Sequence, residues 1–309
     1  MVHPDLVLVG ATLVDGTGSP PQRDVSVLVR DGRIAQVAAA GQGRPAVVPG
    51  PDAVVLDLTG TTLLPGLVDV HVHVTTIPGR PPFDLVTEHP TARVLRAVPV
   101  LRAMLHAGVT TVRDLSGADE AMRACVHEGV VEGPDLQLAL RILSVTGGHG
   151  DWRSLTGVDL TGGSGGGVVA DGPQEFVRAV REVAREGGHW VKVAASGGVG
   201  SPRSDPDQGG LSPAELTAVV QEAQRQGLVG VAAHAQGTGS IRDAVRAGVR
   251  SIEHGYAADA ATVREMADRG TWLVPTLTTL LRTVPDDPQR PWVGQRRRDW
   301  QARARDLVG

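Results

Sequence analysis

The sequence predicts an α/β fold in which strands and helices alternate, preceded by a smaller unit built from strands. From residue 63 onward, apolar runs of strand length recur between segments with helical spacing. Residues 1–62 instead contain short β-branched runs separated by Gly, Asp and Pro turns. The total of 309 residues suits one large α/β domain with room for an accessory unit. This alternation is typical of a parallel barrel or a doubly wound sheet.

Composition and charge narrow the class of protein. Hydrophobic residues make up 41% and charged residues 21%, with a formal net charge of -4, which indicates a globular chain without a basic surface for nucleic acid. The single cysteine, Cys125, excludes an intrachain disulfide and fits a reducing compartment. The start lacks a signal-like pattern, and no apolar run approaches membrane-spanning length. We therefore expect a cytoplasmic protein with neither a nucleic-acid nor a membrane partner.

The individual elements follow from the same patterns. The runs LVLVGATLVDG, VSVLVRDGRIAQV and AVVLDLTGTTLLPG predict a small antiparallel β unit. Intervening helices such as SPAELTAVVQEAQRQG begin near Pro, Ser or Asp and end at Gly. The Gly-rich segment TGVDLTGGSGGGVVADGP is expected to be a covering loop, because no phosphate-binding motif opens a helix there. Seven later strands are expected, near residues 64–74, 109–115, 136–146, 189–196, 229–235, 251–255 and 271–277.

Four histidines stand at the ends of these predicted strands. His71 and His73 are two residues apart on an extended segment, so their side chains point to the same face. His234 and His254 each follow an apolar run and precede a loop. A single histidine in such a place is more often a core or loop residue. Four of the ten histidines at consecutive strand ends, where barrel enzymes place their sites, indicate a metal centre.

Lys192 is the only lysine in the chain and stands between valines in the predicted strand HWVKVAASGG. Burial disfavours an ammonium and lowers its pKa, so a neutral amine becomes accessible near pH 7. A neutral amine can add carbon dioxide and form a carbamate, an anionic ligand able to bridge two cations. The alternative is a barrel lysine paired with a carboxylate that the sequence does not identify.

These residues resemble the amidohydrolase superfamily of metal-dependent hydrolases. The resemblance runs from DGRIAQV through LLPGLVDVHVHV to TWLVPTL. It implies a (β/α)8 TIM-like barrel formed by residues 63–309, beside a small N-terminal β-sandwich domain to which residues 1–62 contribute. It also implies hydrolysis of amide, ester or related bonds with one or two divalent ions.

The resemblance assigns roles to the residues of the predicted centre. His71 and His73 would hold the more buried metal, His234 and His254 the more exposed one, and carboxylated Lys192 would bridge them. Histidine ligands suit Zn²⁺, and the resemblance implies two such ions, while manganese or cobalt is also compatible.

The segment SVTGGHGD resembles the imidazolonepropionase-like and Xaa-Pro dipeptidase-like branch of the superfamily. By that resemblance His149 would polarise the scissile carbonyl, and a loop histidine beside the Gly-rich turn is the competing interpretation. The expected substrates are small molecules, namely dipeptides or N-acyl amino acids.

The sequence departs from the superfamily at its C-terminal part. The family's general base is an aspartate at the end of an eighth strand, and no such strand end follows the seventh predicted strand. Asp114 ends the second strand and Asp151 lies in a loop, so neither replaces it. We therefore expect an incomplete barrel, and a 309-residue chain that is inactive alone although its full-length parent is active.

Two other functions remain open at this point. A cyclic-amide hydrolase or deaminase of the same superfamily would share the site, and a non-catalytic barrel would keep the fold without the chemistry. The resemblance is also compatible with a homo-oligomer. Arg113 and Arg141 lie near predicted strands and could bind a substrate carboxylate, but we expect them to face the outer helices. His89 and His127 are expected at the surface.

Overall fold

The computed structural model describes residues 4–39, 47, 49–76, 88–153, 156, 167–201, 204–281, 283 and 291–308. The chain divides into two compact units, Met1–Leu67 and Val68–Gly309. The boundary lies beyond residue 62 because Thr62–Leu63, strand β5, still pairs with the first strand of the N-terminal unit. Ten residues of the predicted Gly-rich loop, 157–166, lie outside the described residues.

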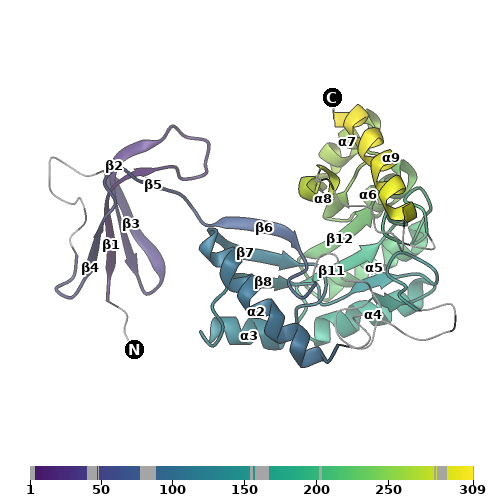
Figure 1. The fold of residues 1–309 in the computed structure, drawn as a ribbon, viewed down its shortest axis with the longest axis horizontal. Coiled ribbons are helices and arrows are strands. Elements are labelled where there is room, and N and C mark those ends of the chain that lie inside the picture. The colour runs from purple at the N-terminus through teal and green to yellow at the C-terminus, as the bar shows by residue number, and fades with distance from the viewer. Residues whose placement is uncertain are drawn as a thin grey trace. The chain divides into compact units, whose positions relative to one another are not determined.

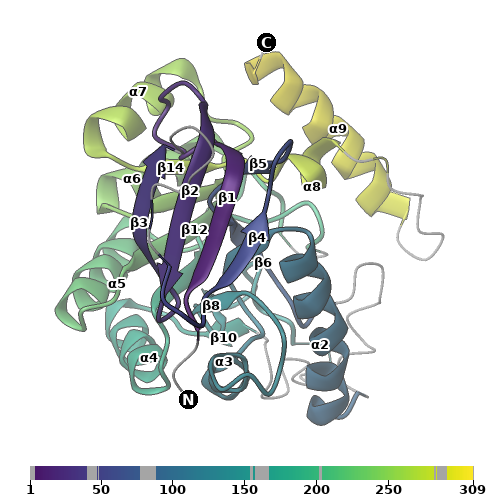
Figure 2. The ribbon, with the colours of Figure 1, turned by 90° about the vertical axis from the view of Figure 1, so that its left-hand side faces the viewer.

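The N-terminal unit is a mixed sheet rather than the antiparallel one expected. Its other strands are β1 (Leu6–Leu13), β2 (Gln22–Arg30), β3 (Arg33–Ala39) and β4 (Val54–Asp57). Figure 2 shows β3, β2, β1 and β4 side by side in that order. The pairs β1–β2 and β2–β3 are antiparallel, but β4 and β5 enter on the other edge of β1 and run parallel to it.

The turn between β2 and β3 follows directly from the sequence. Asp31 and Gly32 both adopt positive φ, at 50° and 70°, in the two-residue loop between the strands. An Asp-Gly pair favours this backbone, whose twist matches that of the flanking strands.

The second unit contains parallel sheets, as the predicted α/β class requires. One sheet has the order β10-β9-β11-β12-β13-β14, with every neighbouring pair parallel, and the other has the order β6-β7-β8. The strands are β6 (Leu67–Val72), β7 (Val109–Asp114), β8 (Asp135–Leu138), β9 (Ile142–Ser144), β10 (Gly167–Val169), β11 (Trp190–Ala194), β12 (Gly230–Ala235), β13 (Ser251–His254) and β14 (Trp272–Val274).

The strand expected over residues 136–146 is broken into β8 and β9. Leu140 stands between them with φ of 65°, a left-handed backbone that interrupts an extended strand. Beside this break, the His189 amide, just before β11, donates to the Leu138 carbonyl at 2.8 Å. The two sheets of this unit are thereby linked at the break, with β8 at the edge of one and β9 inside the other.

Helices connect most pairs of successive strands in the second unit (Figure 1). The start of α5 shows how local sequence sets their ends, since Ser212 and Glu215 form a reciprocal capping box. Gly248 and Gly270 take left-handed backbone just after α6 and α7. The helices are α2 (Pro90–His106), α3 (Glu120–His127), α4 (Pro173–Arg185), α5 (Pro213–Arg225), α6 (Thr238–Ala247), α7 (Ala260–Arg269), α8 (Leu277–Leu281) and α9 (Pro291–Val308).

The main hydrophobic core of this unit lies between the parallel strands and helices α4 to α7. Val191 and Ile252 enter it from strands, and Phe176, Leu216 and Ile241 enter it from helices, all fully buried. This packing fixes the strands whose carboxyl ends carry the predicted site. Across the described residues, no helix is long and apolar enough to cross a membrane.

We expect Phe176→Ala to lower the free energy of unfolding by about 3–5 kcal/mol, because it leaves a cavity where a fully buried ring packs. Urea unfolding followed by circular dichroism measures the change. Val130→Ala is the control, because that side chain is 71% exposed and its truncation should cost less than about 0.5 kcal/mol. Equal effects of the two substitutions would contradict this assignment of the core.

Candidate active site

One cavity of about 850 Å³ in the second unit contains all six residues singled out in the sequence. His71 lies on β6 and His73 directly follows that strand, while Lys192 lies on β11. His234 and His254 belong to the ends of β12 and β13, and His149 to the loop after β9. The carboxyl ends of parallel strands meet at one edge, which explains how residues so distant in sequence share a cavity.

The imidazole rings of the cavity form a continuous series of contacts. Ring centroids are 5.5 Å apart for His71 and His73, 5.1 Å for His71 and His254, and 4.7 Å for His234 and His254. His149 stacks on His234 at 4.2 Å. The five rings therefore lie within a single polar centre.

Two of these histidines are oriented by backbone carbonyl groups. Nδ1 of His73 lies 3.2 Å from the Ser116 carbonyl oxygen, and Nε2 of His234 lies 2.8 Å from that of Gly197. A carbonyl oxygen only accepts hydrogen bonds, so each of these nitrogens donates its N–H. In the neutral ring the other nitrogen keeps its lone pair, which leaves Nε2 of His73 and Nδ1 of His234 able to act as ligands.

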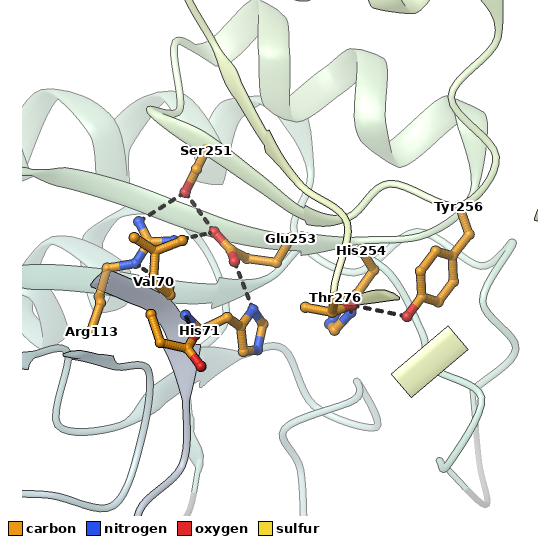
Figure 3. A network of polar contacts seen from close by, with 9 residues as sticks. Val70, His71, Arg113, Ser251, Glu253, His254, Tyr256 and Thr276 are labelled. Atoms are coloured by element: carbon orange, nitrogen blue, oxygen red, sulfur yellow. Dashed lines mark hydrogen bonds and ion pairs between the residues drawn. The ribbon is translucent and has the colours of Figure 1, made fainter. Parts of the chain in front are cut away.

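The other two strand histidines are held by side chains (Figure 3). Nδ1 of His71 contacts Oε2 of Glu253 at 2.7 Å, and Nδ1 of His254 contacts Oγ1 of Thr276 at 2.8 Å. The Tyr256 hydroxyl lies 2.9 Å from the same Thr276 oxygen. In both rings Nδ1 is engaged and Nε2 remains for a ligand.

Burial keeps these rings neutral. Desolvation lowers the pKa of His73 and of His149 to about 4, with the positive charge of Lys192 adding to the effect. It also holds the pKa of the other three well below the usual histidine range; these are His71, His234 and His254. Neutral imidazole is the form that binds a metal ion.

Lys192 is buried without a compensating contact. Its side chain is 1% exposed, and within the described residues its Nζ has no hydrogen-bond partner and no ion pair. Desolvation lowers its pKa to about 8, despite the opposing charge of Glu253. Among the described residues, no carboxylate therefore forms the ion pair that the alternative interpretation of Lys192 requires.

His149 is placed by a close approach of the neighbouring loop. Its Nδ1 atom is buried and has no hydrogen-bond partner among the described residues. A Cβ atom at Gly198 would lie 2.4 Å from Cε1 and Nδ1 of this ring. Only glycine at that position leaves room for His149 where the structure has it.

The two aspartates considered as proton carriers, Asp114 and Asp151, are engaged with other groups. Asp114 is fully buried, and its oxygens accept from the backbone amides of Val74, Ser116 and Ala118 at 2.8, 3.1 and 3.1 Å. Burial outweighs these bonds and raises its pKa to about 7. Asp151 instead pairs with Arg153 at 2.7 Å.

Three charged residues near the centre differ from the expectations drawn from the sequence. Arg113 was expected to face the outer helices but is 5% exposed and bonds to Glu253, because its guanidinium also reaches the Val70 carbonyl inside the sheet. Glu253 itself was not identified, although a charged residue in the buried strand SIEH was a signal. Asp69, two residues before His71, lines the cavity as well.

The donor chemistry of the site fits a divalent ion. Four neutral imidazoles each present one unengaged nitrogen, beside a buried amine. Within the described parts of the chain, no three His, Cys, Asp or Glu side chains alone are placed to hold an ion. The fit therefore depends on the lysine as well as on the histidines.

The fold and the cavity define an α/β enzyme whose site lies at the carboxyl ends of parallel strands. The chain belongs to the amidohydrolase family, whose model matches residues 62–287. This confirms the resemblance and the enzyme class predicted from the sequence. Enzymes of this family are in general metal-dependent.

Individual relatives support the assignment to this family. The chain is 33% identical over 235 residues to ochratoxinase from Aspergillus niger. The aligned region covers 71% of this chain and 48% of the relative. The crystal structure of a prolidase complexed with N-methylphosphonate-L-proline is similar with a TM-score of 0.86 at 32% identity, covering 98% of this chain and 74% of that one. That of A. niger ochratoxinase has a TM-score of 0.82 at 27% identity, covering 97% and 72%. The chain spans about half the length of the curated ochratoxinase.

We expect the Lys192 amine of the metal-free protein to titrate at a pH of about 8. Because the chain has one lysine, biosynthetic ¹³C-lysine gives a single side-chain signal whose shift can be followed by NMR in carbonate-free buffer. Folding favours the neutral amine, so this residue's contribution to folding stability rises with pH between about 8 and 10.5. The urea-unfolded chain is the control and should titrate near 10.5. The same midpoint in the folded protein would contradict the burial of this amine.

Proposed function

We propose that this chain carries the site of a binuclear metal-dependent amidohydrolase that cleaves a carbon–nitrogen bond in dipeptides or N-acyl amino acids. The observation that carries the proposal is the buried Lys192 Nζ, which has no hydrogen-bond partner among the described residues. It lies in one cavity with four imidazoles that each have one nitrogen unengaged by those residues. The prolidase likeness, at 32% identity over nearly the whole chain, supports dipeptides as the substrate class.

The proposed ligand set follows the strands. His71 and His73 would hold one ion through their Nε2 atoms, and His234 and His254 would hold the other through Nδ1 and Nε2. Lys192 would bridge the two ions as a carbamate. Zinc is the ion we expect, because nitrogen ligands suit it.

The carbamate forms on the neutral amine. A pKa of about 8 leaves roughly a tenth of the Lys192 side chains neutral at pH 7. The nitrogen lone pair of such an amine adds to the carbon of carbon dioxide, forming one C–N bond and releasing one proton. The product carries a single negative charge on two oxygens, which replaces an unfavourable buried cation with an anion that cations can neutralise.

Bound divalent ions would supply Lewis acidity and lower the pKa of water to about 7. The protein's own part is to hold the reacting groups. The Ser116 and Gly197 carbonyls fix the orientation of two ligand rings, those of His73 and His234, before substrate arrives. His149 would donate an N–H to the carbonyl oxygen on which charge develops during attack.

We expect an aspartate other than Asp114 and Asp151 to transfer a proton to the leaving amine. Asp114 and Asp151 are committed to other partners. Cytoplasmic location stays a prediction.

We expect the chain, purified without chelator, to contain about two equivalents of zinc and a carbon dioxide adduct on Lys192. Lys192→Ala should lose the adduct and most of the metal, because the bridging anion is gone. Plasma mass spectrometry and intact mass spectrometry measure the two quantities. Lys192→Glu is the matched variant, since its carboxylate restores an anionic ligand and should recover part of the metal. Full metal content in Lys192→Ala would contradict the bridging role.

We expect Gly198→Ala to weaken binding of N-methylphosphonate-L-proline by the zinc-loaded chain by about tenfold. The added Cβ would displace the His149 ring, and one hydrogen bond to a charged group contributes about 1.5 kcal/mol or more. Isothermal titration calorimetry measures the dissociation constant. Gly209→Ala is the control because nothing lies within 4 Å of its added Cβ. Equal affinity of both variants would contradict the placement of His149, and no binding by the unmodified chain would contradict the prolidase-like substrate class.

A further inference from the structure

Glu253 is a fully buried carboxylate that the proposed chemistry does not use directly. It lies on β13, one residue before His254, and has no exposed surface. A buried carboxylate carries a large desolvation cost unless charged and hydrogen-bonded partners compensate it. Its contacts therefore indicate what it does in the fold.

The two oxygens of Glu253 serve different partners (Figure 3). Oε1 accepts from Nη2 of Arg113 at 2.8 Å and from the Ser251 hydroxyl at 2.5 Å. Oε2 contacts Nδ1 of His71 at 2.7 Å. The ion pair with Arg113 thus satisfies one oxygen and leaves the other aimed at the histidine.

Arg113 is itself fixed from two directions. Its Nε donates to the carbonyl of Val70, the residue before His71, at 2.6 Å, and its guanidinium lies 4.5 Å above the Trp190 ring. The carboxylate is therefore held against β6, although 182 residues separate Glu253 from His71 in the sequence. Its position relative to the His71 ring depends on three separate strands, β6, β7 and β13.

We infer that Glu253 is a positioning residue for His71, which fixes the Nδ1–H tautomer and turns Nε2 toward the cavity as a metal ligand. This inference rests on the proposed metal centre. A carboxylate accepts but does not donate, so a neutral His71 must place its one proton on Nδ1. Such outer partners also raise the basicity of the ligating nitrogen, and their loss typically weakens metal binding by 10–100-fold.

Cobalt titration of the metal-free chain, followed by the visible absorption of bound Co²⁺, tests the inference. The unmodified chain is expected to bind two equivalents. In Glu253→Gln we expect one of the two sites to weaken by about 10–100-fold while the other is retained. Glu222→Gln is the matched control, because Glu222 is a buried carboxylate that accepts from Arg181 and Arg225 on the helices. Unchanged affinities in Glu253→Gln would overturn the positioning role.

A second measurement needs no substitution at Glu253. Long-range ¹H–¹⁵N NMR of the histidine rings in the metal-free chain reports which nitrogen carries the proton, and the His71 signals are assigned by their loss in His71→Gln. We expect the Nδ1–H tautomer, and the Nε2–H tautomer would overturn the inference even if Glu253→Gln failed to fold. An unmodified chain that binds no cobalt would instead contradict the proposed function, and the tautomer result would stand separately from it.

Discussion

The cost of removing ionisable groups from water governs this site. A buried cation without a counter-charge is unfavourable, so the pKa values of Lys192 and of the surrounding imidazoles all move toward the uncharged form. The result is a set of nitrogen lone pairs held close together, which solvent would otherwise protonate. The rest of the second unit, from its parallel strands to the helices that pack on them, holds this set in position.

The backbone takes a direct part in this arrangement. The Ser116 carbonyl orients His73, and Ser116 belongs to a turn whose amides are held by the buried Asp114. In the loop after β11, the Gly197 carbonyl orients His234. Because these acceptors are parts of loops that directly follow strands, ring orientation is set by the same local structure that ends each strand.

Much of the site was predictable from sequence, because strand alternation and position after an apolar run place His71, His234 and Lys192 without tertiary information. Three features were not. The break at Leu140 requires a positive φ, and no glycine at that position indicates it in the sequence. Arg113 turns inward because its partner, Glu253, comes from a strand far along the chain. The mixed N-terminal sheet likewise depends on which edge of β1 a later strand joins, and short runs do not specify that pairing.

The solitary lysine gives the molecule an unusual chemical asymmetry. Its only ε-amine lines the cavity and is 1% exposed, so an acylating reagent reaches this amine only when local motion exposes it. The rate at which the Lys192 ε-amine is acylated then reports local opening of the β11 region, in the way that amide exchange reports transient exposure. The rate at which one added acyl group appears by mass spectrometry would therefore measure how often the region around Lys192 is exposed to solvent.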